Sequence, residues 1–185
     1  MDPMEIEKIQ KILWLDLEMT GLSPNDDVII EAAAIITDNL LKELDVYQSV
    51  VKQSQEKLDK MDAWNQKCHR KSGLYPLIPQ GKELISVEDD LLHFTEAQFG
   101  VNEKIILAGN CIYQDRNFIR RYMPRLDKKL YYRMLDITAW KIIFEQKGIV
   151  FKKQNRHRAL EDTKESIREF AFYLENMNFK QPETP

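Results

Sequence analysis

Long apolar runs, paired cysteine motifs and low-complexity segments are all missing from this chain of 185 residues. No apolar run approaches the roughly 20 residues that a membrane-spanning helix needs, and residues 1–11 lack the apolar core of a secretory signal. The two cysteines, Cys68 and Cys111, have no CxxC partner, which argues against a disulfide framework and a zinc site. We therefore expect a cytoplasmic protein with reduced thiols and no membrane association.

What the chain does contain is typical of one globular domain. Hydrophobic residues make up 43% and charged residues 31%, and the length predicts a single domain over residues 1–185 with its core at about 10–178. The net charge is −3, yet residues 101–160, here called the basic segment, hold 14 Lys and Arg against 5 Asp and Glu. Such a segment suits contact with a small anion better than tracking along a long polyanion. Alternatively, the basic and acidic parts interleave in space and no surface is polarised.

Apolar runs separated by turn residues predict strands first and helices later. Strands are expected at 12–17, 28–37, 40–51, 104–108 and 130–135, and helices at 55–72, 87–98, 115–122, 137–146 and 158–177. Ser86 is the expected N-cap of the helix over 87–98. The first three strands follow one another through short turns, which predicts an antiparallel meander, and the later strands alternate with helices. The expected fold class is α/β, with one mixed five-stranded sheet flanked by helices.

Carboxylates stand at the ends of two of these strands and near the last helix. Asp16 and Glu18 share one face of the first strand, because alternate strand residues point the same way. Asp115 follows a buried strand and a Gly-Asn turn, and Asp162 comes about one helical turn after His157. Carboxylate oxygens are preferred ligands of Mg²⁺ and Mn²⁺, two such ions can clamp an in-line phosphodiester hydrolysis, and a nearby histidine can accept a proton near neutral pH.

Each of these residues also has an ordinary structural explanation when it is taken alone. Asp16 and Glu18 could form an exposed strand end, and Asp115 could favour a helix N-terminus through the helix dipole. Asp162 and His157 could be solvated surface residues. Their joint order and spacing argue instead for one site.

Three segments carry a resemblance to a known family: WLDLEMTGL, GNCIYQDRNFI and HRALEDTKESI. They are similar to the three exonuclease motifs of the DEDDh family of 3′→5′ exonucleases. MDAWNQKCHRKSGL and YYRMLDITAWKII also resemble segments of the branch of that family that degrades short RNA fragments, and the similarity extends over about residues 10–178. The resemblance implies a ribonuclease-H-like fold, in which an antiparallel meander precedes parallel strands.

The resemblance also implies an activity and a cofactor. The implied reaction is 3′→5′ hydrolysis of short single-stranded RNA, from dinucleotides to a few nucleotides, to nucleoside 5′-monophosphates by a two-metal-ion mechanism. The implied ligands of two Mg²⁺ or Mn²⁺ ions are Asp16, Glu18, Asp115 and Asp162, with Asp115 acting partly through water. His157 is the implied general base.

Three further residues are implied to bind the bases and the scissile end of the substrate. Leu22 would separate the two bases of a dinucleotide, and Trp64 would stack on one of them. His69 would contact the substrate near the scissile bond. Without the resemblance, the preferred interpretation is that Trp64 is a core aromatic and that Leu22 packs on the sheet.

The 5′ phosphate of the substrate is implied to bind across a homodimer. Tyr132 and Arg133 would reach over from a partner subunit, with Thr138, so that the second subunit completes the active site. At Cys111 the family more usually has a small hydroxyl residue that helps to bind phosphate. A thiol is a poorer donor, which weakens the expectation for this one contact.

Three other functions stay open at this point. The chain could be a DEDDh exonuclease that acts on longer RNA or DNA 3′ ends, of the ribonuclease T or proofreading type. It could be an inactive nucleic-acid-binding module on the same fold, although the four carboxylates and the histidine argue against this. It could also be a non-enzymatic acidic interaction domain. A substrate-length series and Mg²⁺-dependent nucleotide release from RNA distinguish these possibilities.

Overall fold

The computed structural model describes residues 11–100, 103, 105–153 and 157–177. Its strands are β1 (Lys11–Met19), β2 (Ile29–Asp38), β3 (Glu43–Val50), β4 (Ile105–Gly109) and β5 (Leu130–Asp136). Its helices are α1 (Gln55–Asp59), α2 (Ala63–Lys71), the 3₁₀ helix η1 (Tyr75–Gln80), α3 (Leu84–Gln98), α4 (Ile112–Tyr122), α5 (Pro124–Lys129), α6 (Ile137–Glu145) and α7 (Ala159–Glu175).

The strands form one five-stranded sheet in the order β3-β2-β1-β4-β5. β1 pairs antiparallel with β2, and β2 pairs antiparallel with β3. β4 runs parallel to both β1 and β5. The sheet is therefore the expected mixed one, a meander followed by parallel strands, and the predicted α/β class is confirmed.

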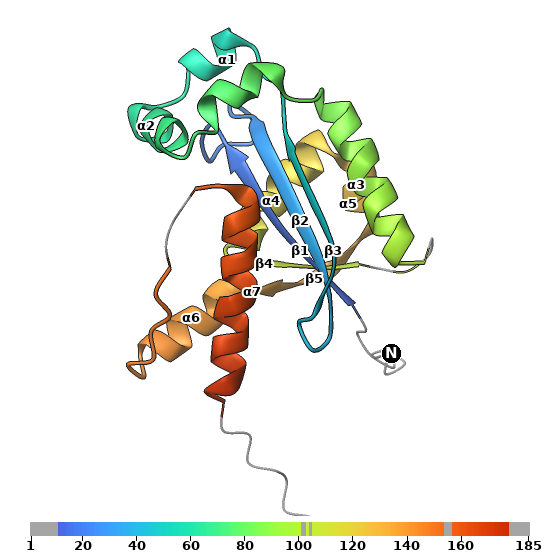
Figure 1. The fold of residues 1–185 in the computed structure, drawn as a ribbon, viewed down its shortest axis with the longest axis vertical. Helices are drawn as coiled ribbons and strands as arrows, with labels where there is room; N and C mark the ends of the chain where they lie inside the picture. The colour runs from blue at the N-terminus through green and yellow to red at the C-terminus, as the bar shows by residue number, and fades with distance from the viewer. Residues whose placement is uncertain (1–10, 101–102, 104, 154–156, 178–185) are drawn as a thin grey trace, which may run out of the picture.

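Helices cover both faces of this sheet (Figure 1). On one face, Leu13, Leu15 and Leu17 of β1 belong to the core that includes residues of α3, α4 and α5. On the other face, Ile12 and Trp14 pack with residues of α6 and α7. Successive strand residues point to opposite faces, so β1 is apolar on both sides until its last residues. The face that packs on α7 is the one that continues into the carboxylates of Asp16 and Glu18.

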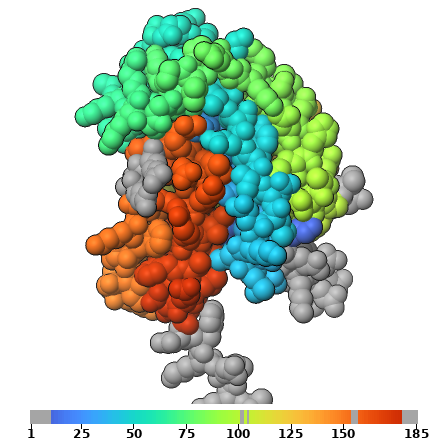
Figure 2. Space-filling model, in the orientation of Figure 1, coloured from blue at the N-terminus to red at the C-terminus, as the bar shows by residue number. Residues whose placement is uncertain are grey.

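β3 forms one edge of the sheet and is only partly covered. Figure 2 shows the β3 region at the surface, in cyan, between α7 and α3. Leu44 keeps 40% and Val46 37% of its surface exposed. The alternation of exposed and partly buried residues along β3 is the pattern of a strand with one solvated side.

Three details of the helices differ from the sequence-based expectation. The single helix predicted over 55–72 was wrong, because the chain turns after α1 and Asp62 caps a new helix, α2, by accepting from Trp64 N and Asn65 N. α3 starts at Leu84, so Ser86 lies inside it and is not its N-cap. Pro124 ends α4 as expected and also opens α5, since proline is well suited to the first position of a helix.

The basic segment and the acidic remainder of the chain interleave in space. Arg125 pairs with Glu88 and Asp89 of α3, and Arg158 pairs with Glu31 of β2. Part of the positive charge of the basic segment is thus neutralised by internal ion pairs. The structure therefore favours the alternative in which the basic and acidic parts of the chain interleave.

Cys68 and Cys111 are both free thiols. Across the described residues, no helix has the length and apolar character required to span a bilayer.

Candidate active site

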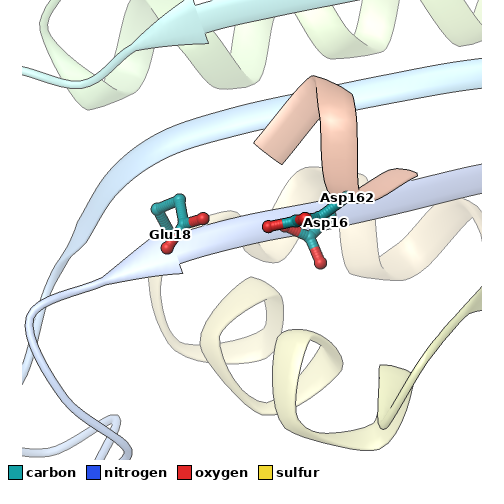
Figure 3. Close-up of side chains that lie close together, drawn as sticks. All are labelled: Asp16, Glu18 and Asp162. Atoms are coloured by element: carbon teal, nitrogen blue, oxygen red, sulfur yellow. The ribbon is translucent and has the colours of Figure 1, made fainter. Parts of the chain in front are cut away.

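Three carboxylates meet where β1 ends beside the start of α7. Oxygen atoms of Asp16, Glu18 and Asp162 lie within 4.8 Å of one another, and Figure 3 shows the three side chains gathered along the end of β1 and the first turn of α7. Asp16 and Glu18 continue the face of β1 that packs on α7, and Asp162 lies in the first turn of that helix. The structure therefore brings together three of the four predicted carboxylates; below they are called the acidic cluster.

Asp115 lies beside the acidic cluster and bonds to the backbone of β1. β4 approaches β1 closely at Gly109, where a Cβ atom would lie 2.8 Å from the Leu15 carbonyl oxygen. α4 then begins at Ile112 and carries Asp115 back to β1. The Leu17 N–H donates to Asp115 Oδ1 at 2.9 Å. One oxygen of Asp115 thus replaces β4 as the hydrogen-bond acceptor for β1.

Burial raises the pKa of all four carboxyls, and repulsion within the group adds to the shift at Asp16 and Glu18. Burial raises the pKa of Asp16 well above its usual range, and the neighbouring carboxylates add to the shift. Burial, followed by the charge on Asp162, raises the pKa of Glu18 to about 8. Burial also raises the pKa of Asp115 to about 7 and, to a smaller degree, the pKa of Asp162. A site that disfavours its own negative charges in this way is suited to bind cations.

His157 lies at the entrance to α7, close to Asp162. Its φ of +52° is in the left-handed region, which residues with a side chain rarely adopt. Its ring meets that of Trp64 edge-on, with a centroid separation of 5.8 Å and an interplanar angle of 83°. Burial raises the pKa of Asp162, and the His157 side chain opposes that shift, as a group close to the carboxylate would. The structure therefore brings the predicted base to the acidic cluster.

His69 is buried against Glu18. Its Nε2 lies 3.1 Å from the Met19 carbonyl oxygen, which can only accept, so Nε2 carries the hydrogen. Its Nδ1 lies 3.8 Å from Glu18 Oε2 and has no hydrogen-bond partner among the described residues. Burial lowers the pKa of His69 and so favours the neutral ring. The structure places His69 next to the acidic cluster, and its contact with substrate stays a prediction.

Leu22 and Trp64 are exposed, with 76% and 62% of their surfaces accessible. The alternatives in which Trp64 is a core aromatic and Leu22 packs on the sheet are therefore wrong. Trp64 stands at the start of α2, where the Asp62 carboxylate accepts from the Trp64 N–H at 2.8 Å. A capped helix start and the His157 ring thus fix the position of an aromatic side chain that faces solvent.

The turn that carries Leu22 is held by hydrogen bonds on both sides. The Asp27 carboxylate accepts from Thr20 Oγ1 and from Ser23 N, both at 3.0 Å. On the outer side, the Gln114 amide donates to the Leu22 carbonyl oxygen. Leu22 is therefore an apolar side chain presented to solvent by a fixed turn.

Cys111 and Thr138 lie in direct contact. The Cys111 N–H donates to Thr138 Oγ1 at 2.8 Å, and the Cys111 sulfur lies 3.3 Å from the same oxygen. Asp136 holds both residues, since its Oδ1 accepts from Cys111 N and from Thr138 N. The two predicted phosphate contacts thus form one polar group at the start of α4 and α6.

Tyr132 and Arg133 lie on the edge strand β5, separated from β1 by β4. Arg133 Nε donates to the Tyr132 hydroxyl at 2.8 Å, and 66% of the Tyr132 surface is exposed. The structure therefore places these residues on an accessible edge. Their action in the site of a second subunit stays a prediction.

Two buried ion pairs border the site and escaped the sequence analysis. Glu31 is fully buried and pairs with Arg158, and Glu169 is fully buried and pairs with Lys153 at 2.9 Å. A signal for Glu31 exists in the sequence, because it is the one charged residue inside the apolar run VIIEAAAIIT. Glu169 gives no such signal, since an acidic residue in a helix is usually solvated.

Solved structures of several nucleases share this fold. An exonuclease I from Methylocaldum szegediense superposes with a TM-score of 0.65 at 18% identity, over 94% of this chain and 41% of that longer chain. A 3′-exonuclease described as recognising a histone mRNA stem-loop superposes with a TM-score of 0.65 at 15% identity, over 96% of this chain and 73% of that chain. At such low identity the likeness concerns the fold alone, and it confirms the ribonuclease-H-like architecture expected above.

Related sequences align with this chain over nearly its whole length. The oligoribonuclease of Francisella tularensis subsp. novicida (strain U112) is 38% identical over 176 residues, which cover 93% of this chain and 98% of that protein. The oligoribonuclease of Pseudomonas savastanoi pv. phaseolicola is 41% identical over 171 residues, covering 90% and 96%. The RNase_T family model, described as exonuclease, matches residues 13–170. The chain therefore belongs to the RNase_T exonuclease family and, within it, to the oligoribonucleases.

Proposed function

We propose that this protein is a 3′→5′ exoribonuclease that hydrolyses short oligoribonucleotides, from dinucleotides to a few nucleotides, and releases nucleoside 5′-monophosphates. The observation that carries the proposal is the meeting of Asp16, Glu18 and Asp162 within 4.8 Å, with His157 at the entrance to the same helix. Its oligoribonuclease relatives cover almost all of the chain, which supports RNA as the substrate.

The donor set fits two divalent cations, Mg²⁺ or Mn²⁺. Asp16, Glu18 and Asp162 offer oxygen ligands close enough to share an ion, and these metals prefer such oxygens. Asp115 has one oxygen on the Leu17 N–H, which supports a role that is partly through water. When bound, the ions stabilise the negative charge that develops on the phosphate during in-line displacement.

The protein itself supplies the base and the positioning. His157 accepts a proton from the attacking water, because a neutral imidazole is a base near pH 7. Trp64 packs edge-on against the His157 ring and restricts its rotation. Water attack at the 3′-terminal phosphodiester breaks the bond to the 3′ oxygen of the preceding nucleotide, which leaves with a proton, and the released nucleotide keeps its 5′ phosphate.

The exposed side chains around the acidic cluster support a short substrate. Leu22 stands on a fixed turn where it can separate two bases, and Trp64 offers a face on which a base can stack. His69, beside Glu18, lies where the scissile end of the substrate would reach. Each of these contacts is independent of base identity, as an enzyme that consumes RNA fragments of any sequence requires.

The far end of the substrate would be bound by phosphate contacts in a homodimer. Cys111 and Thr138 form a polar pair, and Tyr132 and Arg133 lie on an accessible edge strand of each subunit. In the proposed dimer, Tyr132 and Arg133 of the partner subunit close the site over a 5′ phosphate. Closure of the site over the 5′ phosphate would limit the length of RNA that the site accepts.

The test is a length series with a matched histidine control. End-labelled ribonucleotides of two to ten residues, together with a 20-mer, are incubated with Mg²⁺ or Mn²⁺, and products are resolved by length. We expect the dinucleotide to be the preferred substrate and His157→Ala to lose about 10²- to 10⁴-fold in kcat while it still binds Mn²⁺. His93→Ala, on the exposed side of α3, should behave as wild type.

Two results would count against the proposal. Equal degradation of a 20-mer and a dinucleotide would contradict the short-substrate assignment and favour an exonuclease of the ribonuclease T or proofreading type. Turnover near the wild-type rate in His157→Ala would contradict the assignment of the base.

A further inference from the structure

We propose that Glu31 of β2 is a positioning residue for the active site, which fixes the start of α7 and thereby sets Asp162 and His157 against β1. This inference rests on the proposed function, because the placement of these side chains matters only if the acidic cluster binds the metal ions. Glu31 is fully buried, and its carboxylate accepts hydrogen bonds from Gln48, Arg158 and the Ala159 N–H.

Glu31 binds the first residues of α7 through both carboxylate oxygens. Its Oε2 accepts from the Ala159 N–H at 3.0 Å, and Ala159 is the first residue of α7. Arg158 donates from Nη2 to Oε1 at 2.7 Å and from Nε to Oε2 at 3.1 Å. Such two-pronged arginine–carboxylate pairs fix orientation as well as distance, and a carboxylate at a helix N-terminus is also favoured by the helix dipole.

Glu31 also has a fixed relation to the carboxylates on β1. It stands directly opposite Glu18 in the antiparallel pairing of β1 and β2, so both side chains lie on the face that packs on α7. From Arg158 the helix continues at once, because the Asp162 N–H donates to the Arg158 carbonyl oxygen at 2.9 Å. The Glu31 carboxylate on β2 therefore connects two parts of the site. β2 pairs with β1, which carries Glu18, and Glu31 binds the first turn of α7, which carries Asp162.

The same connection constrains His157. This residue directly precedes Arg158, and its left-handed backbone, φ +52°, turns the chain into α7. Without the ion pair between Glu31 and Arg158, the start of α7 is no longer tied to β2. The proposed base and Asp162 can then move relative to Asp16. The expected consequence is a site with the right residues at the wrong separations.

Glu88 offers a matched control, because it has the same chemistry at another helix. It is 2% exposed, accepts from the Arg125 and Leu126 N–H groups at 2.7 and 3.2 Å, and pairs with Arg125 at 2.8 Å. It therefore caps α5 as Glu31 caps α7. None of the candidate site residues lies on α5, so loss of this cap should reduce stability alone.

The experiment compares Glu31→Gln with Glu88→Gln in the full-length protein. Mn²⁺ affinity is measured by titration calorimetry, kcat and KM with a diribonucleotide, and stability by urea unfolding. We expect Glu31→Gln to weaken Mn²⁺ binding and to lower kcat, each by about 10- to 100-fold, as is usual for residues that orient metal ligands. KM should change much less than kcat, and Glu88→Gln should keep wild-type Mn²⁺ affinity and kcat.

Arg158→Lys is the milder second variant if Glu31→Gln fails to fold. It keeps a cation but loses the two-pronged geometry, so the same losses should occur in smaller size. Wild-type Mn²⁺ affinity and kcat in Glu31→Gln, or in Arg158→Lys where only that variant folds, would overturn the proposal. Equal losses of Mn²⁺ affinity in Glu31→Gln and Glu88→Gln would overturn it too. If the wild-type protein releases no nucleotides, the proposed function fails, and the Mn²⁺ affinities still decide the role of Glu31.

Discussion

The acidic cluster and the Glu88 site lie on opposite faces of the sheet and use similar side chains to opposite effect. At Glu88 a buried carboxylate is matched by Arg125 and by backbone N–H groups. In the acidic cluster, carboxylates from β1 and α7 face one another within 4.8 Å, and burial raises the pKa of each. The first arrangement stabilises the fold without a ligand. The second brings carboxylates together at a cost to their charged forms, which suits it to bind cations.

The largest expected effect is that of Asp16→Asn in the acidic cluster. Loss of this proposed ligand should remove several kcal/mol of transition-state stabilisation, so kcat for a diribonucleotide should fall by about 1,000-fold or more. The same variant should gain stability without metal, because a buried like charge is removed, and its Tm in EDTA should rise by about 2–4 °C. Calorimetry and a hydrolysis assay measure both quantities. A Tm in EDTA below the wild-type value would show that the acidic cluster, like the Glu88 site, stabilises the fold without a metal.

Arg125→Ala tests the other side of the comparison. It leaves the Glu88 carboxylate buried without its ion partner, so the free energy of unfolding should fall by about 2 kcal/mol. Hydrolysis at a temperature where the variant is folded should be unchanged. Urea unfolding gives the first quantity, and any large loss of kcat would show that the Glu88 site is coupled to the acidic cluster.

The pH dependence of stability should differ with and without metal. The raised pKa values mean that the folded protein keeps protons that the unfolded chain releases at lower pH. Their stabilisation is present below the ordinary carboxyl range and is lost as pH rises through about 7 for Asp115 and about 8 for Glu18. In EDTA, Tm should therefore be lower at pH 8 than at pH 5 by about 2–4 °C.

Stabilisation by Mn²⁺ should change with pH in the opposite direction, because the ions replace protons on the carboxylates. Thermal unfolding with EDTA and with saturating Mn²⁺ measures the two profiles. A profile in EDTA that is flat between pH 5 and 8 would contradict the raised pKa values.

The smallest expected effect belongs to the border of the site, at Cys111→Ser. A hydroxyl is a better donor than a thiol, and Cys111 already contacts Thr138. One improved hydrogen bond is worth about 0.5–1.5 kcal/mol, so KM for a 5′-phosphorylated dinucleotide should fall by about two- to tenfold. The same dinucleotide without the 5′ phosphate is the control, and its KM should stay the same. Equal changes for the two substrates would remove Cys111 from phosphate binding.

The placement of Asp16 and Glu18 could be predicted, because it depends on residues that are neighbours in the sequence of β1. A strand that is apolar on both sides must be central, and the i, i+2 spacing of Asp16 and Glu18 places both on one face. The meander and the parallel strands followed from turn residues and from the later alternation with helices. These are properties of neighbouring residues, which a sequence shows directly.

The remainder depends on contacts between distant parts of the chain. The hydrogen bond from the Leu17 N–H to Asp115 forms where β4 has ended at Gly109, and no local pattern reports which distant residue takes the place of a strand that ends. The partner of Arg158 is 127 positions away. The break before α2 and the helix α5 were missed for another reason, since Asp62 caps α2 and Pro124 opens α5.

The left-handed backbone of His157 has a consequence for how this position can evolve. Glycine adopts a φ of +52° freely, whereas a residue with a Cβ atom costs about 1–2 kcal/mol there. Selection for folding alone would favour glycine at position 157, and selection for the proposed reaction favours an imidazole. A descendant of this protein that abandoned hydrolysis but kept the fold should therefore lose His157 early, and the residue at this single position would report which of the two pressures the lineage had followed.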